Sequence, residues 1–312
     1  MLWVVLLIMI DDDYHIPVLL HAAVDGLVQN LEGIYVDVTY GGGGHSKEIL
    51  SRINDGILIG FDQDQDALRN LVNDERFKFI GQNFSFLKNN LRMLNHIPVD
   101  GVLADLGVSS HQFDTSDRGF SYRFEGKLDM RMNRELELDA IHVLNHYDEN
   151  ELIRVFKSYG ELRESKRLTR IIVKARNSES IESIEEFVEL IQKIVPRNKT
   201  KQFLSRVFQA IRIEVNAEME VLKKLLEQCV EVLKPGGRLV IITYHSLEDR
   251  MVKNFFKTGN IDGKMEKDFY GNVIRPFKEI NRKPMVPSTE EISINNRARS
   301  AKLRIAEKIK IE

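Results

Sequence analysis

The chain has 312 residues, of which 43% are hydrophobic and 29% are charged, with 19 Gly and 7 Pro. This composition excludes a disordered chain, a collagen-like fibre and a low-complexity linker protein, and it suits about two domains or one α/β domain with an insertion. The 45 Lys and Arg nearly balance the 47 Asp and Glu, giving a net charge of −2, so a nucleic-acid partner must be held by locally clustered charge. The single cysteine, Cys229, cannot form an internal disulfide and excludes a zinc ribbon, and we therefore expect a cytoplasmic protein.

The first ten residues, MLWVVLLIMI, carry no charge and precede three aspartates. The run is shorter than the roughly 17 to 25 apolar residues that span a membrane, and it lacks the basic start and the small-residue cleavage site of a secretory signal. We interpret residues 1–13 as an apolar and acidic extension, and we expect neither export nor a membrane partner.

From residue 34 the sequence alternates short apolar runs with helical stretches. Continuous Val, Ile and Leu runs bounded by turns are typical of a parallel sheet that is covered on both faces. The pattern predicts a doubly wound, Rossmann-like α/β sheet whose first part occupies residues 14–113. We expect strands at 34–40, 57–62, 77–84 and 99–107, and helices at 45–53, 66–73 and 85–94.

The alternation stops between residues 114 and 216, where the apolar spacing becomes helical. We expect this stretch to be an all-helical insertion that recognises the substrate. The α/β pattern resumes over 217–312 with a helix at 217–233, a Lys-Pro-Gly-Gly turn, a strand at 238–244 and a late, antiparallel-looking strand at 302–308. Cys229 lies on the apolar face of the helix at 217–233, which indicates a thiol in the core.

A glycine run, Gly41 to Gly44, lies between the first predicted strand and the first predicted helix, and His45 follows it. Glycines there let a ligand approach the backbone, and a carboxylate such as Asp62, at the end of the second strand, can accept both ribose hydroxyls of a nucleoside cofactor. Dinucleotides and S-adenosylmethionine both fit this pattern. The run is not G-x-G-x-x-G, and Asp37 before it could face a cofactor ammonium, so we favour S-adenosylmethionine with Asp37 and Gly41 among its contacts.

Asp105 ends the fourth predicted strand, and open α/β sheets bind ligands at the carboxyl ends of their strands. For an exocyclic amine such as N4 of cytosine, a carboxylate that accepts an N–H bond would align the nitrogen with the sulfonium methyl. The position of Cys229 within a helix argues against a C5 pyrimidine mechanism, which requires an attacking thiolate. We therefore take Asp105 as the candidate catalytic residue; the alternative is a carboxylate that only caps a turn.

Eight motifs carry a resemblance to a known family. They are HIPVLL at 15–20, DVTYGGGGHS at 37–46, ADLGVSSHQ at 104–112, RGFSY at 118–122, LDMRM at 128–132, RVFQAIRIEVNAE at 206–218, HSLEDR at 245–250 and NNRARSAKLR at 295–304. Over about residues 15–306 the chain resembles the ribosomal RNA small subunit methyltransferase H family. The resemblance implies a class I methyltransferase fold with a helical insertion, and methylation of N4 of a cytidine in 16S ribosomal RNA with S-adenosylmethionine.

The resemblance also implies site residues. Gly43, Gly44 and His45 would contact the cofactor at the glycine loop, and Asp62 would hold the ribose. Phe84 would pack by the adenine, while Asp105 and Gln112 would complete the pocket near the reacting centre. The chain departs from the family at Val38, where a small residue is usual, at Gly42, where a polar one is more frequent, and in its apolar extension.

Positive charge is concentrated in the insertion. Residues 154–176 contain eight Lys or Arg against two Glu, and residues 196–212 contain five basic residues and no acid. We expect this surface to grip phosphates, although charge runs are often only solvated helix faces. The candidate contacts are Lys166, Arg170, Lys174, Arg206 and Arg212.

A second candidate RNA segment interleaves charged and aromatic residues just after the Asp105 strand: Arg118, Phe120, Tyr122, Arg123 and Arg131. Such residues could stack an extruded cytidine and hold its flanking phosphates, because an amine inside a helical stack cannot reach the cofactor. The two aromatic residues could equally join the insertion to the sheet as core residues. His245, after the fifth strand, could line the acceptor pocket or only cap the next helix.

We expect no metal, because His142 and His146 have helical i, i+4 spacing without the Glu of an H-E-x-x-H motif or a third ligand. The expected partners are 16S ribosomal RNA and the small ribosomal subunit, with no DNA; homodimerisation stays open. Three other functions also stay open: a DNA amino-methyltransferase, a nicotinamide-dependent oxidoreductase and a non-catalytic RNA-binding protein. The first should have Asn or Asp followed by Pro-Pro and an aromatic residue at Asp105, and this chain does not.

Overall fold

The computed structural model describes residues 17–310, so the apolar extension at 1–13 lies outside the described residues. A seven-stranded sheet has the order β3-β2-β1-β4-β5-β7-β6. Strands β1 to β5 run parallel, and β7 is antiparallel to both of its neighbours. The fold is therefore the expected doubly wound α/β class. The strands are β1 (Ile34–Asp37), β2 (Ile57–Phe61), β3 (Phe77–Ile80), β4 (Val99–Asp105), β5 (Leu233–Thr243), β6 (Phe277–Glu279) and β7 (Lys302–Lys308).

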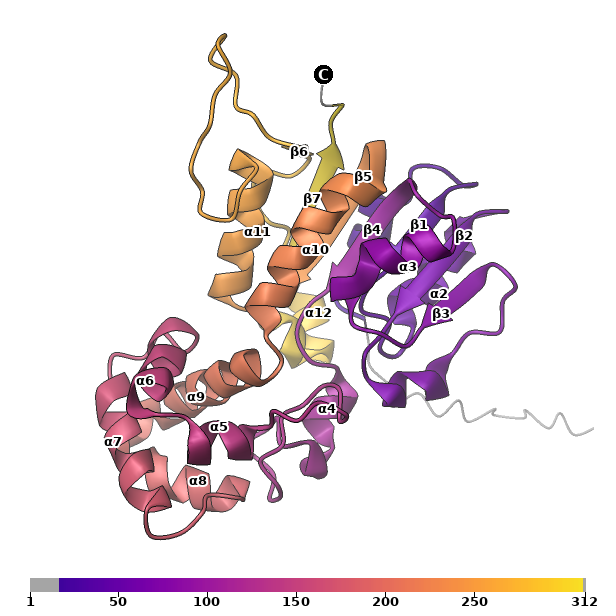
Figure 1. The fold of residues 1–312 in the computed structure, drawn as a ribbon. Coiled ribbons are helices and arrows are strands. Elements are labelled where there is room, and N and C mark those ends of the chain that lie inside the picture. Colours follow the sequence, from indigo (N-terminus) through magenta and orange to yellow (C-terminus); the bar gives the residue numbers. More distant parts are fainter. Residues whose placement is uncertain (1–16, 311–312) are drawn as a thin grey trace, which may run out of the picture.

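Helices cover both faces of the sheet (Figure 1). Because side chains alternate along a strand, Val36 packs with the helices of one face while Tyr35 packs with those of the other. Cys229 is fully buried on the same face of the sheet as Val36, as expected of a core thiol. The first layer contains α3 (Leu87–Met93), α10 (Glu218–Val232) and α11 (Ser246–Thr258), and the second contains α1 (Leu20–Leu27) and α2 (Gly44–Arg52).

The insertion forms a separate lobe beside the carboxyl edge of the sheet (Figure 1). All buried residues of its hydrophobic cluster lie between Phe120 and Val215 in the sequence, so the lobe has a core of its own. No strand is assigned among residues 114–216, all of which are described; a single bridge joins Lys127 to Ser183. The helices of the lobe are α5 (Ala140–His146), α6 (Glu149–Ser158), α7 (Ser165–Arg176), α8 (Ile184–Ile191) and α9 (Thr200–Val215).

Several elements differ from the sequence prediction. The helix expected at 66–73 is a short 3-10 helix, η1 (Gln65–Asn70), which starts where the Asp64 side chain accepts a hydrogen bond from the backbone N–H of Asp66. Strand β5 begins five residues early, because Leu233 pairs with Val99 before an irregularity in the ladder. The sequence analysis also missed β6 and α1. The remaining short elements are α4 (Ser110–Asp114), α12 (Thr289–Ile294), η2 (Phe84–Phe86), η3 (Ser116–Arg118), η4 (Gln192–Ile194), η5 (Arg197–Lys199) and η6 (Asn296–Ser300).

Within residues 17–310, none of the helices combines the length and the apolar character that crossing a membrane requires.

Candidate active site

The glycine run forms a tight loop between β1 and α2. Gly41 and Gly43 have φ angles of 51° and 76°, the left-handed region that glycine adopts without strain. A Cβ atom on Gly44 would lie 2.2 Å from Cγ of Pro17, so a larger residue would clash there. The loop thus presents bare backbone at the carboxyl edge of the sheet, where a ligand can approach closely.

Asp62, just after β2, is tied to this loop. Its Oδ2 accepts a hydrogen bond from the backbone N–H of Gly41 at 2.7 Å, and its Oδ1 accepts one from that of Asp64 at 2.8 Å. Burial raises the pKa of Asp62 to about 6. The carboxylate is therefore fixed in place beside the loop, as an acceptor of two ribose hydroxyls must be.

Asp105 ends β4 at the same edge. Its Oδ1 accepts a hydrogen bond from the Tyr244 hydroxyl at 2.7 Å, and its Oδ2 lies 3.8 Å from Nδ1 of His45. His45 Nε2 lies 3.1 Å from the carbonyl oxygen of Val18 and can donate to it only when protonated, which leaves Nδ1 unprotonated in the neutral ring. Burial raises the pKa of Asp105 to about 7 and lowers that of His45 to about 4. Asp105 can therefore change its protonation state near neutral pH while His45 stays neutral.

These groups line one cleft that encloses about 1200 Å³, including its solvent-open part. The bare glycine loop, the fixed Asp62 carboxylate and the Phe84 ring fit the backbone, ribose and adenine contacts that S-adenosylmethionine needs. Of the predicted cofactor residues, the cleft is lined by Gly41, Gly44, His45, Asp62, Phe84, Asp105 and Gln112.

Two predicted cofactor residues lie outside the lining. Asp37 is 1% exposed, and its carboxylate accepts hydrogen bonds from the Ser46 hydroxyl at 2.7 Å and the Thr39 backbone N–H at 3.1 Å. The expectation that Asp37 faces a cofactor ammonium is therefore corrected. Asp37 instead holds the residues on either side of the glycine run in place through its hydrogen bonds. Gly43 does not line the cleft. The turn requires glycine at this position, because a Cβ atom there would lie 2.7 Å from the Tyr40 hydroxyl.

Arg118 is the clearest correction among the predicted RNA contacts. Its side chain is 1% exposed and forms ion pairs with Asp64 at 2.7 Å and Asp66 at 2.9 Å. Gln112 donates to the same Asp64 oxygen at 2.6 Å. Because a buried guanidinium cannot reach a phosphate, Arg118 instead ties the root of the insertion to the loop that follows Asp62.

The other members of that segment are also packed into the protein. Phe120 is 4% exposed and belongs to the core of the insertion, and the ring of Tyr122 packs edge-on against Phe208. Arg131 pairs with Asp129 at 2.7 Å. The expectation that Phe120 stacks on a base is therefore corrected, and the alternative reading as a core residue holds.

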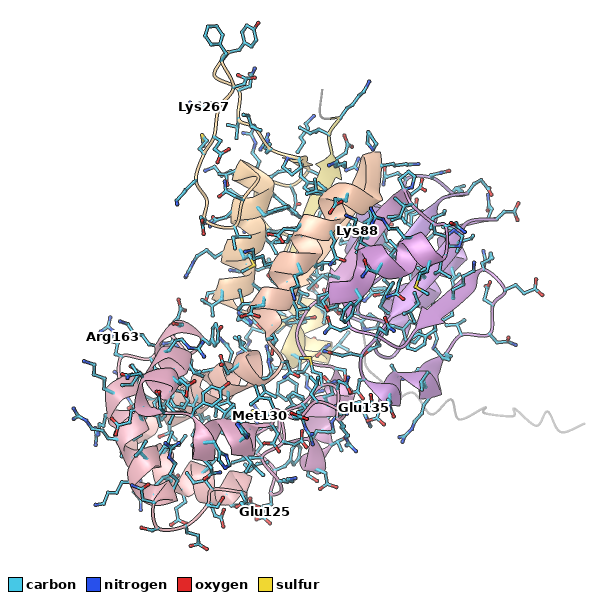
Figure 2. All side chains as sticks on the ribbon, viewed as in Figure 1. Lys88, Glu125, Met130, Glu135, Arg163 and Lys267 are labelled. Atoms are coloured by element: carbon cyan, nitrogen blue, oxygen red, sulfur yellow. The ribbon has the colours of Figure 1, made fainter. Side chains whose placement is uncertain are left out.

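The predicted cations of the insertion divide into two groups. Lys166, Arg170 and Lys174 on α7 and Arg206 on α9 are exposed. Figure 2 shows Arg163, next to the start of α7, pointing away from the lobe into solvent. Arg212 is only 12% exposed and donates to Glu218 from Nε at 2.7 Å and from Nη2 at 2.9 Å, so its prediction as a phosphate contact is corrected.

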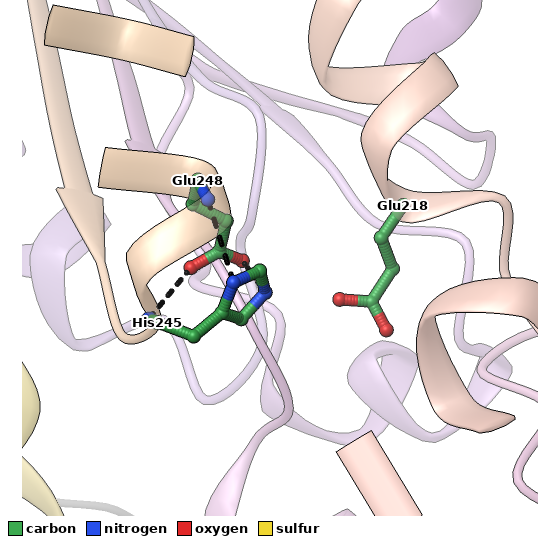
Figure 3. Close-up of side chains that lie close together, drawn as sticks. All are labelled: Glu218, His245 and Glu248. Atoms are coloured by element: carbon green, nitrogen blue, oxygen red, sulfur yellow. Dashed lines mark hydrogen bonds and ion pairs between the residues drawn. The ribbon is translucent and has the colours of Figure 1, made fainter. Parts of the chain in front are cut away.

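His245 caps α11, the alternative that the sequence left open, because its Nδ1 accepts a hydrogen bond from the backbone N–H of Glu248 at 3.4 Å. His142 and His146 stack on each other at 4.6 Å between ring centroids. Among the described residues, the group with metal-ligand spacing is a different one, Glu218, His245 and Glu248 (Figure 3).

Glu248, which follows the fifth strand with His245, lines the cleft as the sequence allowed. The sequence analysis missed four other residues that line it: Asp64, Asn216, Glu218 and Tyr244. Tyr244 was the last residue of a predicted strand, and strand ends at this edge are where functional side chains gather, so that position carried a usable signal. Glu218 and Asn216 stand where the insertion returns to the sheet. Both lie at the end of the motif at 206–218 that carries the family resemblance, and that motif was the available signal.

Comparison with known proteins also indicates a methyltransferase. The family model described as the MraW methylase family matches residues 12–309. The chain is 58% identical over 299 residues to "Ribosomal RNA small subunit methyltransferase H" of Bacteroides fragilis (strain YCH46), covering 96% of this chain and 98% of the relative. It is 57% identical over 298 residues to the protein of the same name from Flavobacterium johnsoniae, covering 95% and 98%.

Among solved structures, an rRNA methylase from Streptococcus thermophilus aligns over 95% of this chain and 99% of its own, with 14% identity and a TM-score of 0.43, which supports no inference about individual residues. The family model and the relatives establish the family of this chain. The chain belongs to the MraW methylase family and is an S-adenosylmethionine-dependent methyltransferase.

Proposed function

We propose that the chain methylates N4 of a cytidine in the 16S ribosomal RNA of the small ribosomal subunit, in the cytoplasm. The name shared by the relatives supports the small-subunit RNA substrate. The main support for an amine acceptor is the Asp105 carboxyl at the end of β4. Tyr244 occupies its Oδ1, and Oδ2 remains to accept an N–H bond.

The cofactor supplies a methyl group on a positively charged sulfur. The residues of the chain hold and orient the reactants: Asp62 would accept the ribose hydroxyls, Phe84 would pack on the adenine, and the loop at Gly41 and Gly44 would admit the chain of the cofactor. Positioning of this kind, with charge fixed where the reaction needs it, supplies much of the rate enhancement in group transfer.

Asp105 would act on the acceptor amine. In the ionised form, its Oδ2 accepts one N–H bond and turns the nitrogen lone pair toward the methyl carbon. Once the amine nitrogen has taken up the methyl group it would be cationic, and Asp105 would accept the one proton that the nitrogen releases. A carboxyl with a pKa of about 7 is partly ionised at neutral pH, so it can first accept the N–H bond and then accept the proton.

The exposed cations of the insertion would hold the RNA. Lys166, Arg170 and Lys174 lie on one helix, α7, and their positive charges are spaced along a single element. Such a row binds phosphates without reading sequence. Because α7 lies on the side of the lobe away from the sheet (Figure 1), the RNA would extend from α7 across the lobe to the carboxyl edge of the sheet.

The test is to incubate the protein with methyl-labelled S-adenosylmethionine and unmethylated small ribosomal subunits, digest the RNA and identify the labelled nucleosides by mass spectrometry. We expect the label in N4-methylcytidine. Label in another nucleoside would overturn the acceptor atom while keeping the methyltransferase activity. Label only in DNA, offered as a parallel substrate, would overturn the RNA assignment.

A further inference from the structure

A loop between α11 and β6 projects from the end of the molecule opposite to the insertion lobe (Figure 1). Its two arms are joined by a bridge between Lys267 and Val273, and the backbone N–H of Ile274 donates to the carbonyl oxygen of Glu266 at 2.9 Å. Figure 2 shows Lys267 near the tip of this loop, away from the other elements. We call residues 264–275 the finger.

One carboxylate shapes the tip of the finger. Asp268 Oδ1 accepts hydrogen bonds from the backbone N–H groups of Tyr270 at 2.8 Å and Asn272 at 2.9 Å, and Oδ2 accepts one from the Asn272 side-chain amide at 3.1 Å. The backbone N–H of Gly271 donates to the Asp268 carbonyl oxygen at 3.0 Å, and Gly271 has a φ of 86°, which glycine adopts without strain. The tip is therefore a defined turn, and its side chains are presented in a fixed arrangement.

The turn presents two aromatic rings to solvent. Phe269 is 99% exposed and Tyr270 is 86% exposed, and the two rings pack edge to face on each other with their centroids 5.8 Å apart. This arrangement leaves ring faces open. Rings this exposed add nothing to the core, and removing them from water elsewhere would be favourable, so their position indicates a binding surface.

Positive charge accompanies the rings. Residues 264–283 contain six basic residues against three acidic ones, although the whole chain has a net charge of −2. Two of the three acids are already engaged, since Asp268 holds the tip and Glu279 lies 3.8 Å from Arg275. The other basic residues of this stretch are all exposed: Lys264, Lys267, Lys278, Arg282 and Lys283.

Unpaired RNA suits this combination better than a protein partner does. Single-stranded RNA stacks its bases on aromatic rings while Lys and Arg hold its phosphates, and each stacked base contributes separately. A stable interface between proteins buries about 1,200 Å² or more, which two rings at the tip of a narrow loop do not supply.

The finger is remote from the reaction centre. Helix α11 starts beside the cleft residues Tyr244 and Glu248, and the finger follows its other end. Its 13 residues extend over about 20 Å. The rings of the finger therefore cannot reach a base whose amine lies at Asp105.

We propose that Phe269 and Tyr270 stack on unpaired bases of the ribosomal RNA at a second contact, about 20 Å or more from the methylated base. The exposed cations beside the finger hold the adjoining phosphates. Because stacking accepts any base, this contact raises affinity and orients the RNA without selecting the target. The inference rests on the RNA substrate of the proposed function and is independent of the acceptor atom.

Three double variants separate stacking from a general apolar contact. Phe269→Ala with Tyr270→Ala removes both rings, Phe269→Leu with Tyr270→Leu keeps two apolar side chains without a flat face, and Phe269→Trp with Tyr270→Trp keeps flat rings. Met93→Ala, at an 81% exposed side chain on α3, is the matched control. All these side chains lie outside the core, so Tm and the Kd for S-adenosylhomocysteine should be the same in every variant.

The experiment measures, by filter binding, the Kd of each full-length protein for unmethylated 16S ribosomal RNA that has been freed of ribosomal proteins. We expect the alanine and leucine variants to bind at least about ten-fold more weakly than the parent, because the stacking of two bases is lost. The tryptophan variant and Met93→Ala should bind like the parent.

Unchanged RNA affinity of the alanine variant, or parent-like affinity of the leucine variant, would overturn the stacking contact. Weaker binding that is confined to assembled subunits would assign the finger to a ribosomal protein instead. A dimer of the parent that the alanine variant abolishes, with RNA affinity unchanged, would assign it to a second copy of the chain. Failure of the proposed function is visible separately, as absence of N4-methylcytidine from the small-subunit assay.

Discussion

Tyr244 and Asp105 join the ends of two neighbouring parallel strands, because the Tyr244 hydroxyl donates to Asp105 Oδ1 at 2.7 Å across the edge of β4 and β5. The bond fixes which carboxylate oxygen is left to face a substrate. It also favours the ionised form of Asp105, against the burial that raises its pKa to about 7. The phenol is thereby a positioning group for the carboxyl that we place at the reaction centre.

Tyr244→Phe should move the pH profile of methyl transfer to higher pH. Removing the hydroxyl takes away a hydrogen bond that lowers the pKa of Asp105, so the carboxyl will ionise only above its present value of about 7. A shift of about one pH unit would lower the ionised fraction of Asp105, and with it kcat, roughly five-fold at pH 7 and leave both nearly unchanged at pH 9. The rate should be followed from pH 6 to 9.5; an equal loss at every pH would mean that Tyr244 has a different role.

Asp105→Asn should raise stability while lowering turnover at least ten-fold. Burial raises the pKa of Asp105 from 3.8 to about 7, so the folded chain binds the proton more tightly than the unfolded chain does. Stability therefore falls as pH rises from about 4 to 7, and the full cost of the buried charge is present at pH 8.

Since one pKa unit corresponds to about 1.4 kcal/mol, the asparagine should gain about 2 kcal/mol or more at pH 8, or a few degrees in Tm, and nothing at pH 4. Thermal unfolding at the two pH values measures this. Asp117→Asn, at an exposed carboxylate, is the control and should show no such pH-dependent gain. A Tm for Asp105→Asn that is equal to the parent at pH 8 would contradict the expected cost.

Arg118→Lys should weaken cofactor binding rather than RNA binding. The guanidinium holds both Asp64 and Asp66, and a lysine can hold only one of them, which loosens the loop that follows Asp62. We expect at least a ten-fold higher Kd for S-adenosylhomocysteine by titration calorimetry, with RNA affinity unchanged. Arg123→Lys, in the same segment but exposed, should change neither. Loss of RNA affinity alone would restore Arg118 as an RNA contact.

Replacing Lys166, Arg170 and Lys174 together by Gln should weaken RNA binding and flatten its salt dependence. Each phosphate contact contributes about 0.7 to 0.9 to the slope of log K against log salt, so the slope should fall by about 2 to 3. Lys223, Lys224 and Lys253 are exposed on α10 and α11, and changing them to Gln removes the same charge elsewhere. Equal effects of the two triple variants would show that only total charge matters.

Phe120→Ala should destabilise the insertion rather than impair base stacking. The ring is 4% exposed within the core of the lobe, and truncating such a residue costs about 3 to 5 kcal/mol. Chemical denaturation should show the loss, and Phe120→Leu should recover much of it. Reduced RNA affinity with unchanged unfolding would instead support the stacking role.

The sheet and its ligand edge are predictable because their signals are local. Each of the five predicted strands before residue 250 exists, and the glycine run, Asp62 and Asp105 meet at one edge because parallel strands bring their carboxyl ends together. Short elements are harder to predict: the three residues of β6 are too few to show an alternating pattern, and the helix expected after β2 is only a short 3-10 helix capped by Asp64.

The roles of the charged residues could not be predicted from local composition. Arg118 and Lys166 both read as members of basic clusters, yet one is enclosed and the other is exposed. What decides between them is a partner remote in the chain, since Asp64 and Asp66 precede Arg118 by more than fifty residues. Spacing within a helix cannot reveal such a pairing.

The position of β7 has a consequence for biosynthesis. β7 is the last strand in the chain but pairs with both β5 and β6, inside the sheet rather than at its rim. The insertion lobe, with its own core, can fold as soon as residue 215 has left the exit tunnel, whereas β5 must wait for residues 302–308 to cover its second edge. During translation the lobe would thus be complete before the sheet, and the nascent enzyme would stay inactive until β7 had left the ribosome.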